Sequence, residues 1–210
     1  MAGKDSGIRT PQDLKGKRLG AQTGSQSLTV FLSKMVPAFG LKEGDFQVVN
    51  TRFPDQLSAL ASKGVDAIVS DDPRPALAEE NGIGYIVVNL YTYDPLPVLL
   101  MARTDLLEAQ SEAVVRFLRV WLDSLPAFTK DLPGVARALQ QALRRRGTEM
   151  PLPLIQTVLG RLVIAPDLTP ALRAYLDDLA KIMRDRREIR SIPDWSRALR
   201  RDVLQKARAR

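Results

Sequence analysis

Apolar residues recur every three or four positions between residues 25 and 39, which is the spacing of one face of an α-helix. The residues on this face are Leu28, Phe31, Leu32, Met35 and Val36. Shorter helical patterns cover residues 54–63 and 73–80. Segments rich in β-branched and apolar residues predict strands at 17–22, 46–50, 65–69 and 85–89. Because these strands alternate with helices, the pattern predicts a mainly parallel sheet.

After residue 97 the pattern changes to helices in succession. The apolar run Val98–Met101 predicts one more strand, and helices follow it. They are expected at 105–128 with an interruption around Pro126, and at 133–146, 152–163, 169–186 and 196–209. In the first of them, Phe117 and Trp121 lie on an apolar stripe that is typical of a core-facing helix. The sequence therefore predicts an α/β lobe at 1–96, followed by a return strand and an all-helical extension at 97–210.

The composition excludes several kinds of catalytic site. The 210 residues include no cysteine and no histidine, so neither a Ser-His-Asp triad nor a cysteine nucleophile can form. Zinc sites built from thiolate or imidazole ligands are excluded for the same reason. We therefore expect no catalytic residues, no metal site and no cofactor, and a protein that is not an enzyme.

Hydropathy bears on the relation of the chain to membranes. Hydrophobic residues make up 45% of the chain, which is enough for a folded core. No apolar run is long enough to span a bilayer, and the first residues lack the apolar segment of a signal peptide. We expect no membrane insertion and no signal peptide in the sequence as given.

The net charge of +7 is concentrated in the C-terminal half. Residues 1–100 contain 10 Lys and Arg against 11 Asp and Glu, whereas residues 101–210 contain 21 against 13. This excess is typical of solvated outer faces of arginine-rich helices. Trp195 is the only aromatic residue in the basic tail 184–210, so the interleaved aromatics of many nucleic-acid surfaces are missing. No nucleic-acid partner is expected.

The first candidate binding segment follows the predicted strand 17–22. Thr23, Gly24, Ser25 and Gln26 form a turn of small and polar residues before a helix. Backbone N–H groups and hydroxyls at the positive end of a helix dipole suit a carboxylate, sulfonate or phosphate. The alternative interpretation is structural, with Ser25 or Ser27 as the helix N-cap and Gly24 as a turn residue.

The second candidate segment, Ser70-Asp71-Asp72, follows the predicted strand 65–69 and precedes Pro73. Two adjacent carboxylates beside an anion-binding loop could bind an ammonium group, so that the two segments together would suit a zwitterion. In the alternative interpretation one of the two aspartates caps the helix that starts at Pro73. We expect one aspartate to cap this helix and the other to face the ligand.

These two segments carry a family resemblance. The sequence Asp-Leu-Lys-Gly-Lys at 13–17 with Gln-Thr-Gly-Ser at 22–25, followed by Gly-Val-Asp-Ala-Ile-Val-Ser-Asp-Asp-Pro at 64–73, resembles the second lobe of type 2 periplasmic solute-binding proteins of ABC importers. The C-terminal part, including Pro-Asp-Trp at 193–195, is more similar to the nitrate, sulfonate and taurine branch. Gln-Thr-Gly-Ser and Asp-Asp-Pro are more similar to the amino-acid branch.

The resemblance implies a type 2 periplasmic-binding-protein fold and a function in transport. Such a protein would bind a small anionic or zwitterionic solute without chemistry, deliver it to an ABC permease, and lie in the periplasm or outside the cell. The acidic group of the solute would be held by Thr23, Gly24, Ser25 and Gln26. An amino group would be held by Asp71 or Asp72, with Ser70 alongside.

One departure and two alternatives accompany the resemblance. Family members begin with a further βαβ portion of the first lobe, so the chain is expected to lack that portion and to bind its solute weakly. The same fold also serves as the effector-sensing domain of transcriptional regulators, such as those of the LysR type. It also occurs in enzymes of the chorismate-dehydratase type, against which the missing histidine argues.

Overall fold

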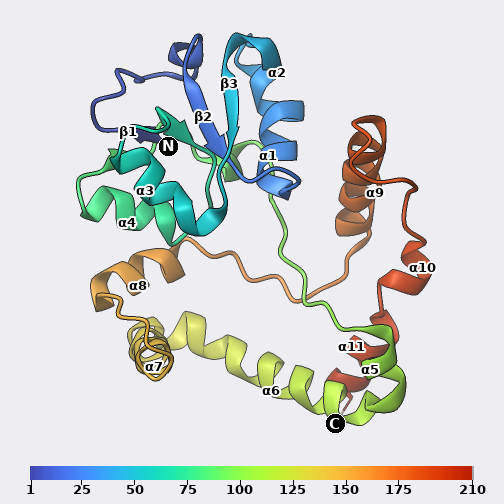
Figure 1. Cartoon of the computed structure of the whole chain (residues 1–210). Coiled ribbons are helices and arrows are strands. Elements are labelled where there is room, and N and C mark those ends of the chain that lie inside the picture. The colour runs from blue at the N-terminus through green and yellow to red at the C-terminus, as the bar shows by residue number, and fades with distance from the viewer. Residues whose placement is uncertain (210) are drawn as a thin grey trace. The chain divides into compact units, whose positions relative to one another are not determined.

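The computed structural model describes residues 1–209, which form two compact units (Figure 1). The first unit is Met1–Pro97 and the second begins at Val98. All five strands of the structure lie in the first unit, and the second unit is helical throughout its regular elements. This is the mixed α/β architecture with a helical C-terminal part that the hydrophobic pattern predicts.

The sheet of the first unit has the order β3-β2-β4-β1-β5. The strands are β1 (Ala2–Gly3), β2 (Arg18–Ala21), β3 (Gln47–Asn50), β4 (Ala67–Ile68) and β5 (Gly84–Tyr85). The β2 strand pairs in parallel with both β3 and β4, as expected for strands joined by helical crossovers. The β1 strand, which the hydrophobic pattern does not predict, pairs antiparallel with β4 and β5.

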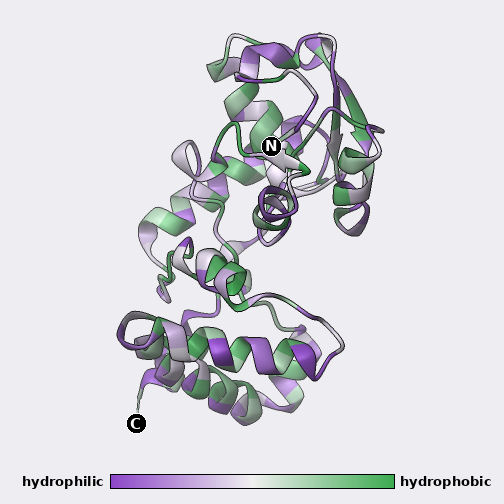
Figure 2. Ribbon diagram, turned by 90° about the vertical axis from the view of Figure 1, so that its left-hand side faces the viewer, coloured by the Kyte–Doolittle hydropathy of each residue, from purple (hydrophilic) through white to green (hydrophobic). Residues whose placement is uncertain are grey.

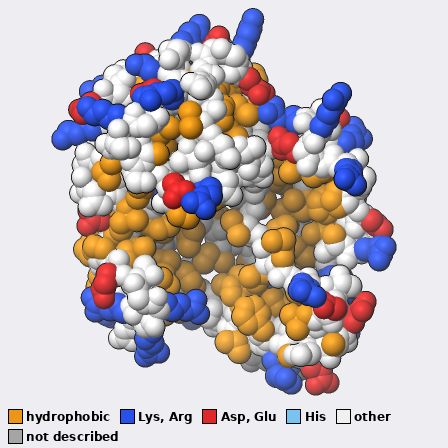
Figure 3. All heavy atoms as spheres, viewed as in Figure 1, with side chains coloured by type: hydrophobic (Ala, Val, Ile, Leu, Met, Phe, Trp, Pro, Cys, Tyr) orange, Lys and Arg blue, Asp and Glu red, His pale blue; other side chains and the backbone are white. Residues whose placement is uncertain are grey.

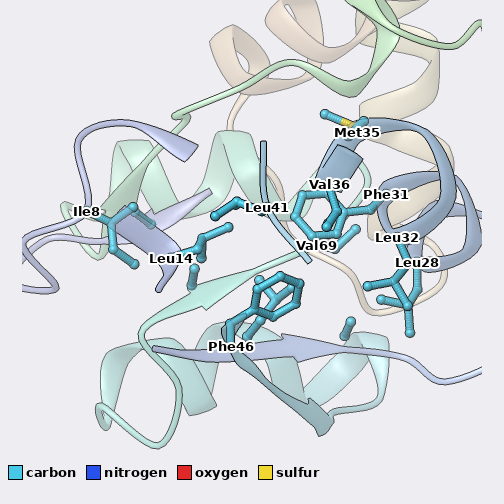
Figure 4. Packing of buried hydrophobic residues seen from close by; sticks show 14 residues of the cluster. Ile8, Leu14, Leu28, Phe31, Leu32, Met35, Val36, Leu41, Phe46 and Val69 are labelled. Atoms are coloured by element: carbon cyan, nitrogen blue, oxygen red, sulfur yellow. The ribbon is translucent and has the colours of Figure 1, made fainter. Parts of the chain in front are cut away.

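Helices enclose two hydrophobic clusters, one on each face of this sheet. The larger cluster joins Ala67 and Val69 to α1 (Gln26–Val30), a π-helical turn (Phe31–Met35) and α2 (Val36–Ala38) (Figure 4). The smaller cluster contains Ile68 together with Leu60 of α3 (Gln56–Ala61), and α4 (Arg74–Glu80) packs nearby. Neighbouring residues of β4 thus serve opposite faces, as strand geometry requires.

The predicted helix at 25–39 is present, but it changes form along its length. Its apolar face is buried as expected, with Met35 fully inaccessible to solvent. The π-helical turn directly precedes α2, whose second residue is Pro37. Proline has no N–H to donate to the preceding turn, so a local widening of the helix is consistent with its position.

The second unit consists of helices in succession. They are α5 (Thr104–Ala109), α6 (Ser111–Lys130), α7 (Leu132–Arg144), α8 (Leu152–Gly160), α9 (Pro170–Asp185), α10 (Trp195–Ala198) and α11 (Arg201–Arg208). Ala136 of α7 and Ile155 and Leu159 of α8 form its buried cluster. Arg119 of α6 donates to the last carbonyls of α11, including that of Ala209 at 2.9 Å, so a cation covers the negative end of that helix. The helices carry alternating hydrophobic and hydrophilic positions (Figure 2).

Several predicted elements differ from the structure: the helix predicted at 196–209 is divided into α10 and α11, and the strand predicted at 65–69 shortens to β4. Val98–Met101 is not a strand: it has no regular structure, and the side chains of Val98 and Met101 are almost fully exposed. An apolar run becomes a strand only where another strand accepts its backbone hydrogen bonds, and all the strands of residues 1–209 belong to the sheet of the first unit. The strand predicted at 85–89 shortens to β5, and the helix predicted at 105–128 is divided at Gln110 rather than near Pro126.

The predicted core-facing stripe of α6 is also not buried. No residue of α6 is buried within the described part of the chain, and 59% of Phe117 is exposed. Hydrophobic side chains accordingly lie on the surface between charged ones (Figure 3). Among residues 1–209, no helix combines the length and the apolar run that a bilayer span requires.

Candidate functional site

The two predicted binding segments lie next to each other in the first unit. One follows β2 and the other follows β4, and these strands are parallel neighbours in the sheet. The carboxyl ends of parallel neighbours meet at one edge, where ligands bind in open α/β sheets. The hydroxyl of Ser27 donates to both carboxylate oxygens of Asp71, at 2.9 and 3.1 Å, and so joins the two segments.

The loop after β2 is held by the Asn50 side chain at the end of the next strand and by a backbone amide of the turn that follows it. The amide of Thr23 donates to Asn50 Oδ1 at 3.1 Å, and the side-chain oxygen of Gln22 accepts from the Phe53 amide at 3.1 Å. Gly24 has a φ of +76°, a left-handed conformation that glycine adopts without strain. The Thr23 amide is therefore already occupied, which leaves fewer backbone donors here than the anion-binding interpretation expects.

Ser25 has the structural role that the alternative interpretation gives it. Its side chain accepts from the Leu28 amide at 3.3 Å, which makes it the N-cap of α1. Gln26 is the first residue of α1 and is half-buried, whereas Thr23 and Gly24 are exposed. The four predicted residues thus lie at one edge of the sheet. Ser25 and Gln26 belong to the start of α1, whereas Thr23 and Gly24 lie exposed in the loop before it.

The loop after β4 corrects one expectation. Neither Asp71 nor Asp72 caps α4, because the N-cap position is occupied by Pro73 and no side chain bonds there. Asp71 is exposed and accepts the Ser27 hydroxyl, and Asp72 is half-buried and precedes a cis peptide bond to Pro73. Because a proline at a helix start supplies no N–H, α4 offers one donor fewer for a capping carboxylate.

A cation that sequence reasoning missed lies within this loop. The Nε of Arg74 donates to Ser70 Oγ at 2.9 Å, and its guanidinium carbon lies 4.5 Å from the centroid of the Phe53 ring. Partial burial lowers the pKa of Arg74, and the carboxylates of Asp71 and Asp72 act in the opposite direction. The four-residue spacing of Ser70 and Arg74 is the only local signal for this arrangement, since Phe53 comes from a distant turn.

The site as a whole is polar and open. Its ionisable groups are Arg74, Asp71 and Asp72, so it offers one positive and two negative charges beside several hydroxyl groups. Such a set can hold a small polar molecule by charge and hydrogen bonds. Within residues 1–209 no group of three or more acidic side chains is arranged to hold a metal ion.

A separate cavity lies in the second unit, at the contact of α6 with α11. Its volume is about 240 Å³, and its lining includes Arg119, Asp123 and Arg208. Arg119 and Arg208 are engaged in structural contacts there, since Arg208 also pairs with Asp167 at 2.7 Å. None of the residues predicted to bind a solute contributes to this cavity.

The sequence matches a known family over more than half of its length. The model of the family described as NMT1/THI5 like matches residues 1–133, which include both binding segments. Among curated protein sequences, none matches the chain.

Solved structures with the same fold include sulfonate-binding proteins. The alkanesulfonate-binding protein SsuA from Xanthomonas axonopodis pv. citri, bound to MOPS, is 20% identical with a TM-score of 0.72, over 96% of this chain and 67% of its own. The periplasmic aliphatic sulphonate binding protein SsuA from Escherichia coli is 22% identical with a TM-score of 0.74, over 94% of this chain and 63% of its own. The chain thus spans about two thirds of the length of these proteins.

An enzyme has the same fold. The desulfurization enzyme DSZB is 15% identical with a TM-score of 0.63, over 100% of this chain and 75% of its own. At these identities the likenesses establish the type 2 periplasmic-binding-protein fold.

Proposed function

The chain belongs to the NMT1/THI5-like family, and on that premise we propose that it is the solute-binding component of an ABC importer. It binds a small anionic or zwitterionic solute at the edge formed by the loops after β2 and β4. A sulfonate, a nitrate-like anion or an amino acid has the required size and charge. Its partner is an ABC permease, and its location is the periplasm or the extracellular side.

The observation that carries the proposal is the bond between Ser27 and Asp71. It brings two loops that are far apart in sequence to one edge of the sheet, where this fold class binds ligands. The solved relatives with bound or named sulfonate ligands support an anionic solute. The carboxylates of Asp71 and Asp72 favour a solute that also carries an amino group, because their combined charge exceeds that of Arg74.

The proposal includes no chemistry on the solute. The chain has no cysteine and no histidine, which leaves carboxylates, lysines and hydroxyl groups as the candidate nucleophiles or bases. At this site Asp71 accepts a hydroxyl, Ser25 caps a helix and Ser70 holds an arginine, so these groups have structural partners. Groups with structural partners of this kind are suited to binding the solute.

A titration of the chain followed by nuclear magnetic resonance tests the proposal. Ethanesulfonate, taurine and glycine are added separately, at millimolar concentration, to protein labelled with ¹⁵N. We expect saturable shifts of the amides at 22–27, 69–72 and 74, with about millimolar dissociation constants because Thr23, Gly24 and Asp71 are exposed. Ethanol, which lacks a charged group, is the control solute. Absence of saturable shifts at both loops with all three charged solutes would refute the proposal.

A further inference from the structure

We propose that Arg74 binds the acidic group of the solute directly, through the two terminal nitrogens of its guanidinium. This inference rests on the proposed function and names the residue that recognises the anion. The loop at residues 23–26 then shapes the site beside this cation, while Arg74 supplies the positive charge.

The guanidinium is held in place by contacts that leave its terminal nitrogens available. Nε donates to Ser70 Oγ at 2.9 Å, and the ring of Phe53 lies against the guanidinium, 4.5 Å from its carbon to the ring centroid. No acceptor within residues 1–209 takes a hydrogen bond from Nη1 or Nη2, and Arg74 forms no ion pair there. The other half-exposed arginine of the first unit, Arg18, differs because it is paired with Asp66 at 3.0 Å.

The guanidinium attracts an added anion, whereas the neighbouring carboxylates of Asp71 and Asp72 oppose it. Arginine stays charged in proteins, so a half-buried guanidinium has lost part of its hydration without losing its charge. An acidic group that accepts from both terminal nitrogens restores these hydrogen bonds in the bidentate form that suits a planar fork. The Phe53 ring against the guanidinium restricts the motion of the side chain, which limits the entropy lost when the anion binds.

The position of Arg74 places it at the candidate site. It is the first residue of α4, two residues after Asp72, and its side chain turns back to Ser70 at the end of β4. Ser70 therefore positions the arginine, and Asp71 beside it accepts the Ser27 hydroxyl from the other loop. A single solute with an acidic group and an amino group could meet both Arg74 and Asp71.

The experiment compares three variants with the unmodified chain in the same titration with ethanesulfonate and taurine. Arg74→Gln removes the charge, and Arg74→Lys keeps the charge without the fork. Arg52→Gln is the matched control, because Arg52 adjoins Phe53 but is exposed and paired with Asp55 at 2.8 Å. We expect Arg74→Gln to reduce the affinity for both solutes roughly ten- to hundredfold and Arg74→Lys to reduce it less. Arg52→Gln should leave the affinity within about twofold of that of the unmodified chain.

The nuclear magnetic resonance signals of the Arg74 side chain test the inference in the unmodified chain, so that this test does not depend on whether the variants fold. In the unmodified chain, the ¹⁵N and ¹H signals of the Arg74 guanidinium should shift with the same dissociation constant as the amides of the two loops. If the amides report binding while these signals and the affinity of Arg74→Gln stay unchanged, the inference is wrong and the proposed function stands. If the unmodified chain binds none of ethanesulfonate, taurine and glycine, the proposed function fails, and this inference fails with it.

Discussion

The hydroxyl of Ser27 and the carboxylate of Asp71, 44 residues apart in sequence, are joined by hydrogen bonds of 2.9 and 3.1 Å. Ser27 is buried in the first turn of α1, whereas Asp71 is exposed at the end of the β4 loop. The bond adds a side-chain link between two loops whose strands, β2 and β4, already pair directly. It also orients the carboxylate, so the same contact has a structural role and a role in the proposed site.

Replacement of Ser27 by alanine should destabilise the first unit by about 1 kcal/mol. The variant loses a hydrogen bond to a charged acceptor, but Asp71 is exposed and regains water, so the penalty stays moderate. Urea unfolding followed by circular dichroism measures the change. Ser62→Ala is the control, because the Ser62 hydroxyl is exposed and bonds only the carbonyl of Ala59 in its own turn. Equal free energies of unfolding for the two variants would contradict the prediction.

The ion pair of Arg18 and Asp66 lies at the opposite end of the strands and should govern stability in acid. Asp66 accepts the Arg18 amide at 2.8 Å and the guanidinium at 3.0 Å, and these bonds lower the pKa of Asp66 below its ordinary value of 3.8. Its carboxylate therefore stabilises the fold above about pH 4, and the contribution is lost as the pH falls through the folded-state pKa.

The variant Asp66→Asn tests this dependence. At pH 7 we expect it to unfold with a free energy lower by about 1–2 kcal/mol. The difference from the unmodified chain should stay constant above pH 5 and shrink below pH 4, as measured by urea unfolding across this range. Solute affinity at pH 7 should not change, since the pair lies away from the candidate site. A difference that grows on acidification would have the wrong sign.

The stability of the fold should depend strongly on the ion pair of the buried Asp94 with Lys34. Its side chain is fully buried, and one oxygen lies 2.7 Å from Lys34 Nζ while the other accepts the Leu96 amide at 2.9 Å. Removal of one member of a buried ion pair leaves a desolvated charge, so Lys34→Met should cost about 3 kcal/mol.

The exposed pair of Lys63 with Asp5 provides the comparison for this prediction. Lys63→Met should cost less than about 1 kcal/mol, because both charges remain hydrated. In the double variant Lys34→Met with Asp94→Leu, part of the lost stability should return, since the buried charge is gone as well. If Lys34→Met and Lys63→Met have the same free energy of unfolding, the interpretation of Asp94 is wrong.

The sequence predicts features that depend on neighbouring residues better than features that depend on distant ones. The helical spacing from Leu28 to Val36 and the N-cap at Ser25 are local, and the structure contains both. Val98–Met101 fails as a strand because β-structure also needs a partner strand, which an apolar run cannot specify.

The same contrast between local and distant interactions applies to the candidate site. The two loops could be placed at one edge from the expected parallel order of their strands, and the Ser27–Asp71 bond is consistent with that placement. Arg74 was missed because its guanidinium is held by the ring of Phe53, which is 21 residues earlier in the chain. A contact between residues so far apart in sequence cannot be predicted from the local sequence pattern.

Charge at position 71 should distinguish solutes with an amino group from solutes without one. Asp71→Asn keeps an oxygen that can accept the Ser27 hydroxyl but removes the negative charge, so the loops should stay joined. We expect its affinity for taurine to fall roughly tenfold, while its affinity for ethanesulfonate stays the same or rises. Asp71→Ala should weaken taurine binding further, because it also removes the acceptor of the Ser27 hydroxyl. Asp72→Ala should weaken taurine binding through the loss of its charge. Calorimetry with both solutes measures the two affinities.

The comparison of taurine with ethanesulfonate separates recognition of the amine from general effects on the loop. These two solutes share a sulfonate and differ by one amino group, so an effect on loop structure should weaken both equally. A selective loss of taurine therefore assigns the ammonium group to the carboxylate. Unchanged taurine affinity in both Asp71→Ala and Asp72→Ala would instead show that these carboxylates do not hold an amine. The solute would then be a simple anion that is held by Arg74 and makes no amine contact with the aspartates.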